Sequence, residues 1–197
     1  EVPKPYRKEV IVVDAHSTDN TPQILAKYRD RIKVVYDEGR GIGIARNIGV
    51  LSSSGYYICF VDADCIVSRD HFAKILRAFE EGADIVDTGG YLPLSVIGRL
   101  SIPKFSKLEL SIWRIGRAYT SKEMIKDRCF AGGSFIAFRR NVFYAVGGFW
   151  SYPPYGCDDL DFSYRAYRRG YVIKVVRCLG TVSLPRLRLA DFIREHW

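Results

Sequence analysis

An unbroken run of strand-forming residues that ends in two acids constrains the fold of this chain more than any other feature. Residues 56–61 are aromatic, β-branched or small and apolar, and Asp62, Ala63 and Asp64 follow them directly. A run of this kind is typical of a strand buried on both faces of a parallel sheet. Because ligands of open α/β sheets bind beyond the carboxyl ends of the strands, Asp62 and Asp64 are expected at a ligand site.

Two carboxylates separated by one residue can turn toward a single cation where the chain leaves a strand. Mg²⁺ and Mn²⁺ prefer such oxygen ligands, and substrate phosphates usually complete their coordination. Asp62 and Asp64 therefore predict a divalent metal site. The alternative is that the two acids only mark a turn, since turn geometry favours Asp.

The spacing of apolar segments predicts an α/β fold. Strands are expected to start near residues 9, 32, 56 and 83, about one for each β-α unit. This rhythm is typical of a doubly wound, mostly parallel sheet flanked by helices. One helix is expected over residues 72–79 with its cap near Ser68, and others around residues 108–115 and in the last ten residues. Further strands are expected at 134–138 and 171–176.

Composition favours one domain with an anionic partner. The 197 residues are 48% hydrophobic, which suits a single core. No apolar run reaches the roughly 18 residues of a membrane span, and no signal peptide opens the chain. Five cysteines without a C-x-x-C pair indicate a reducing compartment. The net charge of +8 suits a nucleotide diphosphate, an anionic lipid or a nucleic acid.

Two further residues are candidates for binding a nucleotide. Asp14 ends the first expected strand, and in a parallel sheet it would share a rim with Asp62; a helix N-cap is its alternative role. Arg46 lies among the glycines of residues 39–49, where its guanidinium could meet a pyrophosphate or simply face solvent. The glycine spacing matches neither a P-loop nor a dinucleotide-binding fingerprint.

Three acids open a later helix. Asp158, Asp159 and Asp161 follow a loop rich in glycine and proline. Acids in a first turn complement the helix dipole, and that alone could explain them. Crowded like charges near a metal site can also raise one pKa and produce a general base. The sequence leaves both interpretations open.

Four segments together resemble the motifs of inverting family 2 glycosyltransferases with the GT-A fold. The matching segments, in the family's order, are Val-Val-Asp-Ala-His-Ser-Thr-Asp-Asn-Thr at 12–21, Gly-Ile-Ala-Arg-Asn-Ile-Gly at 43–49, Phe-Val-Asp-Ala-Asp at 60–64, and Gly-Gly-Phe at 147–149 followed by Asp-Asp-Leu-Asp-Phe-Ser-Tyr-Arg at 158–165. The resemblance covers about residues 9–176.

The resemblance implies transfer of a sugar from a nucleotide-diphosphate donor to a hydroxyl acceptor, with inversion and with Mg²⁺ or Mn²⁺. It implies that Asp14 contacts the nucleobase, that Asp62 contacts the ribose or the metal, and that Asp64 holds the metal against the diphosphate. The metal and Arg46 would neutralise charge on the leaving diphosphate. The nucleotide-binding half would be about residues 1–90 of the single domain 1–197.

The other half, about residues 91–197, would bind the acceptor. The resemblance implies that Asp159 is the general base; Asp158 stands where the family usually has Glu, so the choice between the two stays open. Gly132 and Gly133 match a loop that borders the donor sugar and the acceptor. A lipid-linked or cell-envelope glycan acceptor is expected, at the cytoplasmic side or peripherally at the inner face of the cell membrane, with no nucleic-acid partner.

One departure and two rival interpretations accompany the resemblance. The family's opening strand and first helix are absent, so the chain is expected to be N-terminally truncated and its sheet to lack one parallel strand. A haloacid-dehalogenase-like phosphatase also has a strand ending in D-x-D, with Asp62 then the nucleophile, although that motif normally lies on the first strand. A basic nucleic-acid-binding module is the non-catalytic alternative, but no nucleic-acid signature is present.

Overall fold

The computed structural model of the protein describes residues 2–88, 90–91, 129–151, 157–176, 178–179 and 182–183. The helices expected around residues 108–115 and in the last ten residues lie outside these ranges. The described elements are β1 (Ile11–Asp14), α1 (Thr21–Ala26), β2 (Lys33–Tyr36), α2 (Ile42–Leu51), β3 (Tyr57–Cys59), β4 (Cys65–Ile66), α3 (His71–Glu80), β5 (Ile85–Asp87), β6 (Gly90–Tyr91), a 3-10 turn (Gly133–Phe135), β7 (Ile136–Arg139), α6 (Arg140–Val146), α7 (Asp158–Tyr167), β8 (Ile173–Val175), β9 (Cys178–Leu179) and β10 (Val182–Ser183).

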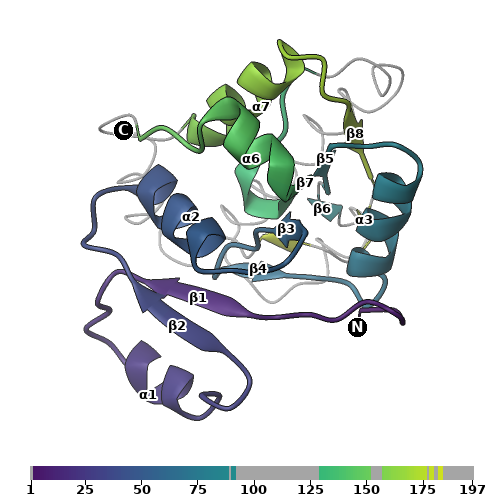
Figure 1. The fold of residues 1–197 in the computed structure, drawn as a ribbon. Coiled ribbons are helices and arrows are strands. Elements are labelled where there is room, and N and C mark those ends of the chain that lie inside the picture. The colour runs from purple at the N-terminus through teal and green to yellow at the C-terminus, as the bar shows by residue number, and fades with distance from the viewer. Residues whose placement is uncertain are drawn as a thin grey trace, which may run out of the picture.

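The central sheet has four strands in the order β3-β7-β5-β8 (Figure 1). Strands β5 and β8 are parallel, whereas β7 runs antiparallel to both of its neighbours. Strands β1 and β2 form a separate parallel pair. The α/β architecture is therefore as expected, with one reversed strand inside a mostly parallel arrangement, which is common in mixed sheets.

Aromatic side chains fill the core on the side of the sheet covered by α6 and α7. The ring of Phe149 stacks on Phe162 at 4.1 Å between centroids, and Phe138 of β7 lies 4.9 Å from Phe162. All three side chains are almost fully buried. On the opposite face, α3 packs Ile75 and Phe79 against the sheet. Helices on both faces explain why β7 reads as a continuous apolar run.

Strand β3 is less buried than its sequence predicts. Ile58 is 7% exposed, but Tyr56 and Val61 on either side of the strand are 57% and 39% exposed. The reason is a cavity of about 1080 Å³ that separates β3 from β1 and is lined by both strands and by residues of α2 and α3. In the described part of the chain, β1 pairs only with β2 and β3 only with β7. The expectation that the sheet lacks a strand stays a prediction.

Helix α3 includes all of the expected residues 72–79, and its N-cap is Asp70, two residues after Ser68, near which the sequence predicts the cap. The hydroxyl of Ser68 instead donates to the Asp70 carboxylate at 2.6 Å. Among the described residues, no helix has the length and apolar character needed to cross a membrane.

Candidate active site

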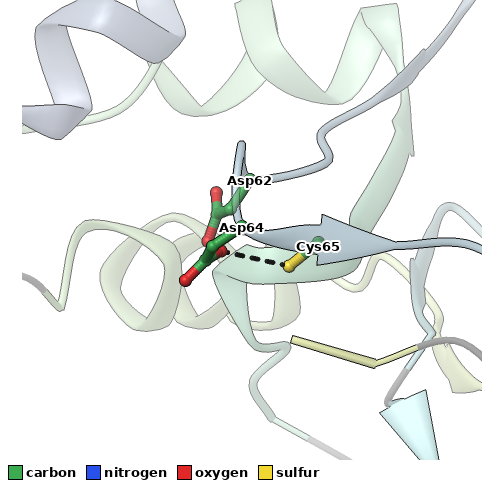
Figure 2. Close-up of side chains that lie close together, drawn as sticks. All are labelled: Asp62, Asp64 and Cys65. Atoms are coloured by element: carbon green, nitrogen blue, oxygen red, sulfur yellow. Dashed lines mark hydrogen bonds between the residues drawn. The ribbon is translucent and has the colours of Figure 1, made fainter. Parts of the chain in front are cut away.

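Asp62 and Asp64 lie just beyond the carboxyl end of β3, as the sequence predicts. A backbone bond from Cys65 N–H to the Asp62 carbonyl, 3.0 Å long, turns the chain there. In Figure 2 the two carboxylates extend side by side from this turn, and one ligand atom each from Asp62, Asp64 and Cys65 lie within 4.8 Å of one another. Two carboxylate oxygens so close together fit a hard divalent ion such as Mg²⁺ or Mn²⁺.

The Asp62 carboxyl is partly buried and lies near several charged and polar groups. Its side chain is 35% exposed. Burial raises its pKa above the ordinary value; a hydrogen bond from Ser134 and the charge of Arg46 oppose this rise, while Asp64 and Asp159 add to it. Asp159, from α7, is therefore close enough to act on Asp62 through its charge.

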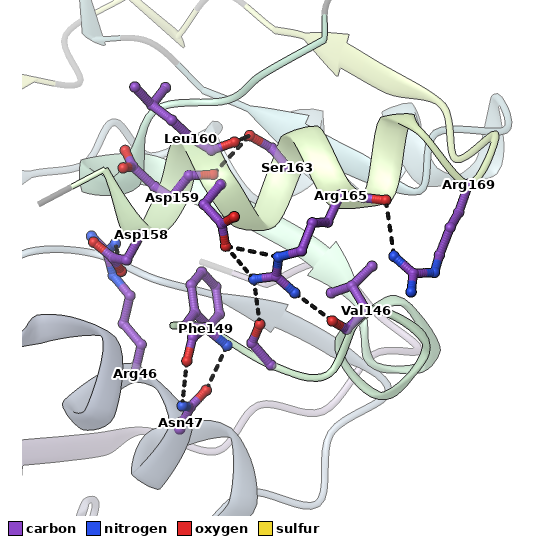
Figure 3. A network of polar contacts seen from close by, with 12 residues as sticks. Arg46, Asn47, Val146, Phe149, Asp158, Asp159, Leu160, Ser163, Arg165 and Arg169 are labelled. Carbon is purple, nitrogen blue, oxygen red and sulfur yellow. Dashed lines mark hydrogen bonds and ion pairs between the residues drawn. The ribbon is translucent and has the colours of Figure 1, made fainter. Parts of the chain in front are cut away.

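The three acids at the start of α7 differ in their surroundings, and Figure 3 shows Asp158 beside Arg46 with Asp159 next to it. Asp158 is 2% exposed and accepts a 2.6 Å bond from the Arg46 guanidinium. Asp161 pairs with Arg165 one helical turn later, at 2.7 Å from its Nε. The half-buried Asp159 carboxylate makes no hydrogen bond to any residue that the structure describes.

The Asp158 carboxyl is held in a nearly water-free pair. Burial raises its pKa, the Arg46 guanidinium opposes this, and the neighbouring Asp159 charge adds to the rise. Dipole capping does not account for the three acids, because Asp158 and Asp161 each serve a specific arginine. Asp159 is left as the carboxylate that faces the site without a partner in the described chain.

Asp14 is the last residue of β1, and the ends of β1 and β3 both pack against α2. It is 7% exposed and accepts bonds from the backbone and hydroxyl of Ser17. It does not cap α1, because the Asp19 carboxylate accepts from Thr21 N–H at 2.8 Å. A Cβ on Gly49 of α2 would lie 3.3 Å from Val13 and 3.8 Å from Phe60, so α2 crosses the ends of both β1 and β3.

The loop with Gly132 and Gly133 is tied to both acidic groups. The N–H of Ala131 donates to the Ser163 hydroxyl of α7 at 3.0 Å, and the N–H of Asp62 donates to the Ser134 carbonyl at 3.3 Å. A Cβ on Gly132 would meet no atom within 4 Å, so the loop borders open space there. The structure therefore brings this loop, the D-x-D turn and the start of α7 to one place.

Sequence reasoning missed two residues of this region. Ser134 contacts Asp62, and nothing in its local sequence marks it. Asp87 ends β5, is 7% exposed and accepts from Gly132 N–H at 3.4 Å. The strand-end argument used for Asp62 could have found Asp87, since residues 83–87 were expected to be a strand.

The α/β fold and the D-x-D turn beside the acidic start of α7 agree with the family resemblance of the sequence. The family model "Glycosyl transferase family 2" matches residues 3–147. The chain belongs to this family. The haloacid-dehalogenase alternative is excluded by this membership.

Two curated relatives illustrate the similarity. The chain is 27% identical over 175 residues to a poly-beta-1,6-N-acetyl-D-glucosamine synthase of Staphylococcus aureus, which covers 85% of this chain and 40% of the relative. It is 33% identical over 81 residues to the protein EpsH of Bacillus subtilis, covering 40% of this chain and 24% of the relative. The chain thus spans less than half the length of either.

Solved structures show the same fold. A Pyrobaculum calidifontis mannosyltransferase in complex with GDP-Man and Mn²⁺ matches with a TM-score of 0.67 at 20% identity, over 93% of this chain and 50% of its own. S. aureus TarS residues 1–349 in complex with UDP-GlcNAc matches with a TM-score of 0.59 at 20% identity, over 87% and 49%. The expected GT-A fold is confirmed.

Proposed function

We propose that this chain carries the donor-binding and catalytic centre of a metal-dependent, inverting glycosyltransferase. The observation that carries the proposal is the convergence of two acid pairs from distant parts of the chain, Asp62 with Asp64 and Asp158 with Asp159. One pair suits a cation and its diphosphate, and the other offers a base for an acceptor hydroxyl. The solved mannosyltransferase with GDP-Man and Mn²⁺ supports the same arrangement by fold.

The donor would lie along the ends of β1 and β3. Asp64, with Asp62, would hold Mg²⁺ or Mn²⁺, which would supply positive charge to the departing diphosphate. Asp14 would accept a hydrogen bond from the nucleobase, and Asp62 could also contact the ribose. The open loop at Gly132 and Gly133 would border the donor sugar.

Asp159 would act as the general base. Asp158 is committed to Arg46 at 2.6 Å in a buried pair, so a proton taken from the acceptor would disrupt that pair. The half-buried Asp159 has no such commitment in the described chain. Removing the hydroxyl proton as the sugar carbon is attacked from the side opposite the diphosphate gives inversion.

The acceptor would be a cell-envelope or lipid-linked glycan. One relative is named for making a polysaccharide, poly-beta-1,6-N-acetyl-D-glucosamine. The net charge of +8 suits contact with anionic lipid headgroups at the inner face of the membrane. No nucleic-acid partner is proposed.

The donor class can be tested with a thermal-shift panel. Nucleotide diphosphates of all bases and their sugars would be added with and without Mn²⁺ to the longest natural form of the protein, and to its Asp64→Asn variant. Stabilisation by one base only, dependent on Mn²⁺ and lost in the variant, is expected. Stabilisation that ignores metal, or none across the panel, would count against the proposal.

A further inference from the structure

Arg46 connects the two acid pairs of the site. It projects from α2 and is 7% exposed. Its Nη1 lies 2.6 Å from the Asp158 carboxylate on α7, and its Nη2 lies 4.0 Å from the Asp62 carboxylate at the D-x-D turn. Asp62 and Asp158 are 96 residues apart in the chain, and the guanidinium of Arg46 faces both.

The guanidinium is fixed in orientation. Its central carbon lies 5.8 Å from the ring centres of both Phe60 and Phe149. The next residue, Asn47, clamps Phe149 with two bonds, donating to its carbonyl at 2.7 Å and accepting from its N–H at 2.8 Å (Figure 3). Arg46 therefore cannot turn toward a ligand without leaving a buried Asp158 unpaired, which is costly.

Helix α2 is pressed against the loop that precedes α7. A Cβ on Gly43 would lie 2.6 Å from the Trp150 carbonyl, so only glycine permits this approach. Gly148 likewise leaves room for the Asn47 side chain, whose oxygen would be 2.9 Å from a Cβ there. Residues 45–47 of α2 thus pack closely against the loop before α7 and fix the position of the start of that helix.

We propose that Arg46 is a positioning residue of the transfer reaction: by holding Asp158, it sets the adjacent Asp159 against the Asp62–Asp64 site, and it does not bind the donor diphosphate. This inference rests on the proposed function. It replaces the sequence-based expectation that Arg46 meets the pyrophosphate. A residue in this role affects the chemical step and leaves donor binding largely intact.

The test compares Arg46→Lys, Asp158→Asn and the double variant with Arg140→Lys as matched control. Arg140 is also partly buried, but it donates to the Gly55 and Val50 carbonyls and to Ser53, away from the acids. Lysine keeps the charge and loses the planar fork that fits a carboxylate. The dissociation constant of the Mn²⁺–nucleotide diphosphate complex would be measured calorimetrically, and kcat and KM with the best donor of the panel.

The expected result is a split between binding and turnover. Arg46→Lys and Asp158→Asn should each lower kcat about 100-fold, while the nucleotide dissociation constant changes less than about threefold. The double variant should be no slower than the worse single one, because the two residues act as a unit. Arg140→Lys should lower the melting temperature comparably and leave kcat near that of the wild type.

Three outcomes would overturn the inference. The first is nucleotide binding weakened tenfold or more by Arg46→Lys with kcat unchanged, which would make Arg46 a donor ligand. The others are an unchanged kcat, or fully additive losses in the double variant. If Arg46→Lys does not fold, Asp158→Asn alone must still lower kcat and spare binding. Failure of the wild type to bind any nucleotide would instead contradict the proposed function.

Discussion

At the scale of single residues, the adjacent carboxylates of Asp158 and Asp159 have different surroundings and different proposed roles. Asp158 points into the protein and pairs with Arg46, whereas Asp159 is half-buried and faces the D-x-D turn. Adjacent residues on a helix point about 100° apart, so one of them can serve structure while the other serves chemistry.

Replacing the proposed base should stop turnover without loosening the fold. Asp159→Asn is expected to lower kcat by about 10³-fold, within the range for loss of a general base, with nucleotide affinity unchanged. Asp158→Asn should be milder and should also lower the melting temperature, because it removes the nearer of the two carboxylates that the buried Arg46 faces. Kinetics and thermal melts on both variants check this. Equal kinetic losses with equal melting temperatures would contradict the division of roles.

The Asp62 carboxylate is expected to lower the stability of the fold while serving metal and nucleotide binding. Its folded-state pKa lies above 3.8 because of burial, so its ionised form at neutral pH disfavours the folded state. Asp62→Asn should therefore raise the melting temperature at pH 7 by about 1–3 °C while abolishing Mn²⁺-dependent nucleotide binding. This difference in melting temperature should shrink as the pH falls toward 3.8, because the Asp62 carboxyl of the wild type then becomes protonated in both the folded and the unfolded chain. A variant that melts lower than the wild type at pH 7 would refute this reasoning.

At the scale of elements, α3 depends on a histidine buried at its start. His71 is fully buried between Phe72 and Phe135. Burial lowers its pKa from 6.5 to about 4. As the pH falls below 6.5, His71 binds a proton in the unfolded chain but stays neutral in the folded chain. The free energy of unfolding is therefore highest above pH 6.5 and declines as the pH falls from 6.5 to about 4.

The loss over that window should approach about 3 kcal/mol for this one group. His71→Phe removes the titrating group and keeps an aromatic ring in the pocket, so its unfolding free energy should vary less with pH between 6.5 and 4. Urea unfolding of both proteins across this range measures the difference. Parallel curves would show that His71 does not control the acid response.

Elements with strong local signals were predictable from sequence, and elements set by distant partners were not. The apolar residues at helical spacing in α3 and the acids at the start of α7 predict those helices, because the deciding interactions lie within one or two turns. The reversal of β7 has no local signal, because strand direction depends on neighbours brought in by tertiary contacts.

The same distinction applies to the site. Asp62 and Asp64 were found because strand ends carry ligands in α/β sheets. The choice between Asp158 and Asp159 stayed open because it depends on Arg46, which lies 112 residues from Asp158 in the chain. The exposure of Tyr56 and Val61 was missed because a sequence does not show which strand edges are covered.

At the scale of the whole molecule, a cavity lies between the facing edges of β1 and β3, which have no pairing strand there among the described residues. The backbone N–H of Lys33 donates to the Val10 carbonyl, and the N–H of Asp37 donates to the Asp14 carbonyl. Because every second residue of a strand bonds to the same neighbour, the amides of Ile11 and Val13 point away from β2. On the other side, Phe60 N–H donates to Ile136, which turns the Tyr57 and Val61 backbone groups away from β7. A strand laid between them would join the two sheets.

Hydrogen exchange tests this geometry. In residues 1–197, the amides of Ile11 and Val13 should exchange at least about tenfold faster than those of Val12 and Asp14, because only the latter lie in a ladder. In a form of the protein that fills the cavity with a strand, all four should become slow. Equal protection of neighbouring residues in the 197-residue chain would show that the edge is already covered.

We expect one divalent ion to be shared by Asp64 and a donor diphosphate beside α7. Electron–nuclear double resonance on Mn²⁺ bound to the protein, with the nucleotide diphosphate selected by the panel, measures it most directly. Phosphorus coupling to protein-bound Mn²⁺ is expected in the wild type, and it should be lost in Asp64→Asn and retained in Asp159→Asn. Protein-bound Mn²⁺ without phosphorus coupling, or coupling that survives in Asp64→Asn, would contradict it.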